Sequence, residues 1–135
     1  AGESVRLASY DFTTLETGEG TLVEPKPIIM VEGIFVLAIP EIRNGPSVDI
    51  FMDVDGEIRL ARRVIRDVIR HERSDLGKEG YEDDINYYLD YVKKGFDRFV
   101  LPHKPTADFV VDASIAADTT VERTLEFLRG RGLVD

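Results

Sequence analysis

The 135-residue chain has no cysteine, no tryptophan and two histidines. The absence of cysteine excludes disulfide bonds, thiolate metal sites and a cysteine nucleophile, and it is compatible with a reducing compartment. No uninterrupted apolar run reaches the length of a membrane-spanning helix, and no signal peptide opens the sequence. We therefore expect a cytoplasmic protein with no membrane partner, folded as a single domain over residues 1–135.

Basic residues are also fewer than acidic residues. Seventeen basic residues against 26 acidic ones give a net charge of −9, whereas proteins that bind nucleic acid are usually basic. No nucleic-acid partner is expected on this ground. The charge is uneven, however, because residues 57–73 hold six arginines against three acidic residues, a net of +3.

Apolar runs and turn residues predict strands that alternate with helices. Extended segments at 4–12 and 20–25, joined by a glycine-containing turn, predict an antiparallel hairpin over residues 4–25. Buried strands are expected at 28–35, 48–54 and 108–114, and helices at 57–73, from Asp84 to about Pro102, and near the C-terminus. The fold class is therefore α/β, a parallel sheet with flanking helices and a small antiparallel hairpin.

One carboxylate interrupts the apolar run "IIMVEGIF" at 28–35. A lone buried Glu is costly unless it is paired or binds a metal. In one interpretation Glu32 is half exposed at the end of a strand and Gly33 makes a bend. In the other, Glu32 stands at the carboxyl edge of a parallel sheet, where ligands bind in open α/β folds. The residues alone leave both interpretations open.

The arginines of the predicted helix 57–73 share one face. At about 100° per residue they fall within a sector of roughly 100°, opposite the apolar residues: Arg59, Arg62, Arg63, Arg66, Arg70 and Arg73. A solvated face usually mixes charges, because like charges four residues apart repel. The stripe favours anion binding, for which arginine supplies bidentate phosphate contacts. A solvated or salt-bridged face is the alternative.

Four motifs occur in order along the chain: Y-D-F at 10–12, E-G-I at 32–34, R-R-x-x-R-D at 62–67 and F-x-x-F-x-x-P-x-K-x-x-A-D at 96–108. With them the chain resembles the uridine (uridine–cytidine) kinase family of P-loop kinases. Phosphoribulokinase and pantothenate kinase are more distant relatives. The resemblance implies a P-loop kinase-like fold and ATP-dependent phosphoryl transfer to a nucleoside, with Mg²⁺ as cofactor and with nucleosides and nucleotides as small-molecule partners.

The resemblance also implies roles for particular residues. Catalytic contacts to the transferring phosphate would come from a helical lid over residues 57–99, which includes a mobile loop at 74–83. The implied site residues are Glu32 beside the magnesium ion, Tyr10 and Phe12 in the nucleoside pocket, Arg63 and Arg66 on the lid as catalytic residues, and Arg73 near the substrate.

A phosphate-binding loop of the form G-x-x-x-x-G-K-[ST] does not occur in the sequence. The family carries that loop upstream of the matched region, so the chain is expected to supply the substrate and lid elements of a kinase. The alternative is a non-catalytic phosphate- or nucleotide-binding module or subunit. The resemblance also implies that the family's central strand, which lies between the strands matching 28–35 and 48–54, is upstream of the matched region. Either these two strands pair directly, or the gap is filled by the upstream strand or by a strand of another copy in a homo-oligomer, which we favour.

Overall fold

The computed structural model divides the chain into two compact units, Ala1–Glu32 and Gly33–Asp135. No helix in the described part of the chain combines the length and the apolar character that crossing a bilayer requires. The described residues are 2–11, 13–43, 47–66 and 77–135.

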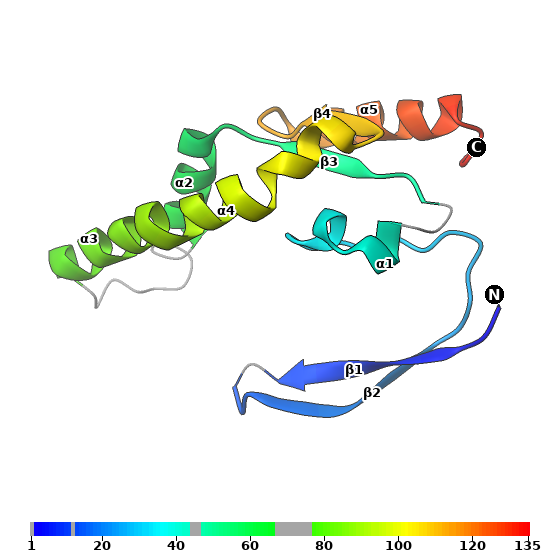
Figure 1. Cartoon of the computed structure of the whole chain (residues 1–135), viewed down its shortest axis with the longest axis horizontal. Coiled ribbons are helices and arrows are strands. Elements are labelled where there is room, and N and C mark those ends of the chain that lie inside the picture. The colour runs from blue at the N-terminus through cyan, green and yellow to red at the C-terminus, as the bar shows by residue number, and fades with distance from the viewer. Residues whose placement is uncertain (1, 12, 44–46, 67–76) are drawn as a thin grey trace. The chain divides into compact units, whose positions relative to one another are not determined.

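The first unit contains the predicted hairpin. Strands β1 (Val5–Asp11) and β2 (Glu16–Val23) pair in antiparallel register (Figure 1). The carboxylate of Asp11 accepts hydrogen bonds from the backbone N–H groups of Thr13 at 2.7 Å and Thr14 at 3.4 Å. These bonds stabilise the ionised form and lower the pKa of Asp11. Asp11 thus holds the turn that returns the chain into β2.

Strand β2 begins at Glu16, earlier than the predicted 20–25, because residues 16–19 extend the pairing with β1 and do not belong to the turn. The register shifts between Leu7 and Ser9, and Gly20 there adopts a φ of +74°. A Cβ atom at this position would lie 1.7 Å from the carbonyl oxygen of Leu7. Glycine is therefore required where the two backbones approach, which is its usual role in a β-bulge.

The second unit is built on a small parallel sheet. Strands β3 (Ile50–Asp53) and β4 (Phe109–Asp112) pair in parallel, and helix α5 (Ala117–Gly130) follows (Figure 1). Phe51 of β3 and Val111 of β4 are 4% and 1% exposed. The ring of Phe127 on α5 stacks on the ring of Phe109 in β4, and the two ring centroids are 4.4 Å apart. The predicted strands at 48–54 and 108–114 are confirmed in shorter form, as is a mixed α/β architecture with a parallel sheet and flanking helices.

The predicted buried strand at 28–35 is wrong. No β-strand is assigned there, and its side chains are exposed, with Met30 at 87% and Ile34 at 73%. The only hairpin and sheet pairings among the described residues are β1 with β2 and β3 with β4. An extended segment becomes a strand when a neighbour accepts its backbone hydrogen bonds. The described part of the chain places no such neighbour beside 28–35.

Helices account for most of the remaining second unit. The segment after the first unit contains a 3₁₀ turn (Val36–Ala38) and α1 (Pro40–Arg43), and α2 (Gly56–Val64) follows β3. Helix α3 (Gly77–Tyr87), a π-helical segment (Tyr88–Val92) and α4 (Lys93–Phe99) form one continuous helical stretch (Figure 1). A 3₁₀ segment (Leu101–Thr106) then leads into β4.

The predicted loop at 74–83 is wrong from Gly77 onward, where α3 has already begun; residues 74–76 lie outside the described residues. The two glycines in the segment favoured a loop in the sequence. Continuity with the helical segments that follow outweighs the glycine penalty.

Candidate functional site

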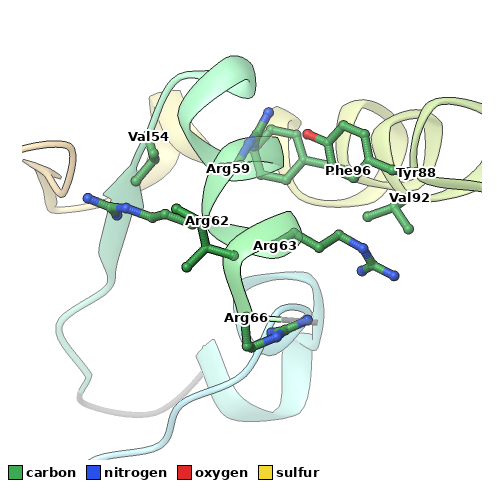
Figure 2. Close-up of a pocket in the computed structure, with 9 residues that line it drawn as sticks. Val54, Arg59, Arg62, Arg63, Arg66, Tyr88, Val92 and Phe96 are labelled. Atoms are coloured by element: carbon green, nitrogen blue, oxygen red, sulfur yellow. The ribbon is translucent and has the colours of Figure 1, made fainter. Parts of the chain in front are cut away.

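A pocket of about 640 Å³ lies in the second unit, a size typical of small-molecule sites. One wall comes from α2 and the residues that follow it, and the other from the helical stretch that runs from α3 to α4 (Figure 2). Its lining residues are Val54, Arg59, Arg62, Arg63, Ile65, Arg66, Tyr88, Val92 and Phe96. Four arginines thus meet an aromatic and aliphatic surface.

The arginine wall depends on the start of α2. Asp55 occupies the N-cap position, although its side chain makes no capping hydrogen bond. The backbone N–H of Arg59 donates to the carbonyl oxygen of Asp55 at 3.0 Å. From this start, the helical period brings the arginines at 59, 62, 63 and 66 to the pocket. The predicted arginine face is therefore confirmed for the described part of the helix.

The arginines differ in what they contact. The guanidinium of Arg59 lies 3.5 Å from the ring centroid of Phe96, which is a close cation–π contact. The Nε atom of Arg59 is buried and has no hydrogen-bond partner among the described residues. Arg59 is therefore committed to the aromatic wall.

Arg62 is held by the sheet. Its Nη1 donates to the carbonyl oxygen of Ala113 at 2.8 Å, and its Nη2 donates to that of Ser114 at 3.4 Å. These carbonyls directly follow β4. In Figure 2 the side chain of Arg62 extends away from Tyr88 and Phe96, whereas Arg63 extends toward the helix that carries them.

Sequence reasoning did not single out the aromatic wall. Tyr88 is 6% exposed, and its hydroxyl donates to the carbonyl oxygen of Gly56 at 3.3 Å. Tyr88, Val92 and Phe96 are spaced four apart and face the pocket. Apolar residues recur at intervals of three and four from Ile85 to Phe99. They include Val92 and Phe96, but the others are exposed: Ile85 at 38%, Leu89 at 45% and Phe99 at 48%. The four-residue spacing was a usable signal, whereas the π-helical segment, which changes the helical period, was not foreseen.

Polar groups gather where the two parallel strands end. Asp53, the last residue of β3, accepts a hydrogen bond from Nζ of Lys104 at 2.6 Å in an ion pair. Asp112, the last residue of β4, accepts hydrogen bonds from the hydroxyl and backbone N–H of Ser114, and these lower its pKa. No group of three or more residues able to ligate a metal is found within the described residues.

The predicted site residues fall into three groups. Arg63 and Arg66 line the pocket together. Tyr10, at 50% exposure on β1, and the exposed Glu32 belong to the first unit, which is described by itself. Phe12 and Arg73 lie outside the described residues.

Comparison with known proteins gives a consistent match. A model of the phosphoribulokinase/uridine kinase family matches residues 1–120. The chain belongs to this family. Similar proteins include a uridine kinase of Clostridium perfringens strain ATCC 13124, which is 36% identical over 132 residues, covering 94% of the chain and 61% of that protein.

Further members extend the match. A uridine kinase of Staphylococcus haemolyticus is 36% identical over 111 residues, covering 82% of the chain and 51% of that protein. The uridine-cytidine kinase 2-B of Danio rerio is 33% identical over 134 residues, covering 96% of the chain and 49% of that protein. The resemblance drawn from the sequence motifs is thus confirmed. The chain spans about 60% of the length of the Clostridium protein and about half of the other two.

Proposed function

We propose that the chain supplies the substrate and lid elements of a kinase that transfers a phosphoryl group from ATP to a nucleoside such as uridine or cytidine. The observation that carries this proposal is the pocket in which one helix presents four arginines opposite an aromatic and aliphatic wall. Such a pocket suits a ligand with phosphate groups at one end and an apolar ring at the other. The names of the similar proteins point to the same substrate class.

Arg63 and Arg66 are the proposed catalytic residues. Charge spreads over the phosphoryl oxygens in the transition state, and catalysis of this transfer consists mainly of positioning and charge stabilisation. A guanidinium donates two parallel N–H groups to phosphate oxygens and keeps its positive charge at any physiological pH. Both residues stand on the pocket-facing side of the helix, one turn apart, a spacing that suits a ligand with more than one phosphate.

Glu32 is the proposed magnesium-binding residue. Mg²⁺ in phosphoryl-transfer sites retains several waters and takes one or two carboxylates together with the substrate phosphates. Glu32 is exposed, and no ion pair or hydrogen bond of its side chain is found among the described residues. A lone uncommitted carboxylate therefore fits this need, while Asp53 is already paired with Lys104. The ion would supply charge neutralisation at the phosphates.

The remaining roles follow the family motifs. Tyr10 and Phe12 would line the nucleoside pocket, Arg73 would contact the substrate, and residues 57–99 would act as a lid over the site. A loop able to cradle the β- and γ-phosphates in backbone N–H groups does not occur in these 135 residues. The proposal therefore requires that a longer natural chain or another subunit supply this loop. A cytoplasmic location stays a prediction.

The proposal is tested by titrating the 135-residue chain with inorganic pyrophosphate in a calorimeter. We expect the unmodified chain to bind and the double variant Arg63→Ala/Arg66→Ala to lose binding. The variant Lys94→Ala is the matched control, because it removes an exposed positive charge that is paired with Asp90 outside the pocket. Loss of binding in the control, or unchanged binding in the double variant, would contradict a phosphate site in this pocket.

A phosphate- or nucleotide-binding module without catalysis is the second candidate, and the arginines that line the pocket would serve it equally well. The two candidates differ in turnover. The complete natural polypeptide should transfer the γ-phosphate of ATP to uridine or cytidine if the first candidate is right. The purified 135-residue chain alone should show no transfer in either case. Binding of nucleotide with no transfer by the complete polypeptide would favour the module.

A further inference from the structure

We propose that Arg62 is a positioning residue that ties α2 to the carboxyl end of β4 and thereby holds Arg63 and Arg66 in the pocket. The inference deepens the proposed function, since it rests on this pocket being the phosphate site. It departs from the sequence pattern, which places Arg62 on the same face as the other arginines and predicts the same role for all of them.

The contacts of Arg62 carry the inference. Two nitrogens of one guanidinium bind two successive carbonyl oxygens, at 2.8 Å for Ala113 and 3.4 Å for Ser114. Ala113 is 8% exposed, so its backbone groups need partners within the protein. Its N–H donates to the carbonyl oxygen of Asp53 at 2.8 Å, and its carbonyl is bound by Arg62. The guanidinium thus continues the hydrogen bonding of the sheet beyond its last strand pair.

This contact connects two parts of the unit that are distant in sequence. At its other side, α2 is held by the helical stretch, through the Tyr88 hydroxyl on Gly56 at 3.3 Å and through Arg59 on the ring of Phe96. Arg62 supplies the matching link to the sheet. Arg63 is the next residue and Arg66 is one turn further, so the angle at which α2 is held determines where both guanidiniums lie.

A direct role for Arg62 in anion binding makes different predictions. A lysine at this position would retain the positive charge but lack the planar fork that spans two carbonyls. If Arg62 bound the anion directly, the Arg62→Lys variant would keep much of the affinity. If Arg62 acts through the fork, Arg62→Lys and Arg62→Ala should both weaken binding, although lysine keeps the charge.

The test combines calorimetry with amide hydrogen exchange on the 135-residue chain, with inorganic pyrophosphate as the probe. We expect Arg62→Ala and Arg62→Lys each to bind pyrophosphate about fivefold more weakly, the factor that corresponds to losing one hydrogen bond's net contribution. Amides of α2 should exchange faster in both variants, while those of the β1–β2 hairpin should be unchanged. Lys94→Ala should match the unmodified chain in both measurements.

Two results would overturn the inference. One is unchanged exchange in α2 of both variants, which would mean that Arg62 does not tie the helix to the sheet. The other is retained affinity in Arg62→Lys with lost affinity in Arg62→Ala, which would assign Arg62 to the anion itself. Should the unmodified chain bind no pyrophosphate, the proposed function fails, and the exchange of α2 alone then decides for or against the tie.

Discussion

Replacing Arg66 by alanine is expected to weaken pyrophosphate binding about tenfold. A hydrogen bond to a charged group contributes about 1.5–3 kcal/mol, and Arg66 is exposed, so we take the lower end of this range. A free-energy change of about 1.4 kcal/mol corresponds to a factor of ten in the dissociation constant. Arg63 is half-buried and less screened by water, so its alanine variant should lose about 2 kcal/mol, roughly thirtyfold.

Two comparison variants separate specific contacts from general charge. Arg59→Ala should weaken binding less than Arg66→Ala or Arg63→Ala does, because the Arg59 guanidinium is engaged 3.5 Å from the ring centroid of Phe96 and would affect the anion only through the position of α2. Lys94→Ala removes the same unit of charge from an exposed position on the helical stretch. Its effect should stay below about twofold at 0.15 M ionic strength, where the Debye length is about 8 Å.

The assay is isothermal titration of each variant with pyrophosphate at that ionic strength, with thermal unfolding followed by circular dichroism to confirm that each variant is folded. Equal losses for Arg66, Arg63 and Arg59 would refute the reasoning, because they would indicate a diffuse positive patch with no preferred ligand contacts. A loss for Lys94→Ala as large as that for Arg66→Ala would lead to the same conclusion.

Three further perturbations test other parts of the molecule. In the complete natural polypeptide, Glu32→Gln should abolish magnesium-dependent phosphoryl transfer and leave nucleoside binding intact; full activity in a radiolabel assay would exclude the metal role. Gly20→Ala places a Cβ 1.7 Å from the carbonyl oxygen of Leu7 at a positive φ, and the resulting backbone strain is at least about 1–3 kcal/mol. This strain should remove the cross-strand NOEs of the hairpin. Persistence of these NOEs would contradict the bulge. Ser114→Ala removes the hydroxyl bond to Asp112 and should raise the pKa of Asp112 toward its ordinary value. The folded-state pKa of Asp112 is lowered, so its stabilising contribution is present above the unfolded-state pKa of about 3.9 and is lost as the pH falls through the lowered value. An NMR titration showing the same pKa in both proteins would refute the hydroxyl contribution.

Local sequence patterns determined several features of this protein. Apolar runs identified β3 and β4, and their parallel pairing followed from the alternation with helices. The helical period placed the arginines of α2 on one face, which is the face that lines the pocket. Short motifs indicated the family, because a motif is recognised from the identity and the order of its residues and requires no knowledge of packing.

Only the tertiary structure decided what these elements meet. The run at 28–35 has the composition of a buried strand, yet burial needs a neighbouring strand, which the described residues do not provide. Gly20 stands at the start of a predicted strand, and only the approach of Leu7 across the hairpin makes it the site of a bulge. Such outcomes depend on a second segment, which a local pattern does not contain.

The arginine face shows the same division most clearly. Periodicity makes Arg62 and Arg63 neighbours with one predicted role, but Arg62 binds the carbonyls of Ala113 and Ser114, the nearer of them 51 residues away in sequence. The guanidinium of Arg59 likewise contacts the ring of Phe96 on another helix. Helical geometry sets the side from which a side chain projects, whereas its partner is set by long-range packing. That packing gives Arg59 and Arg62 contacts with another helix and with the sheet, which periodicity does not predict.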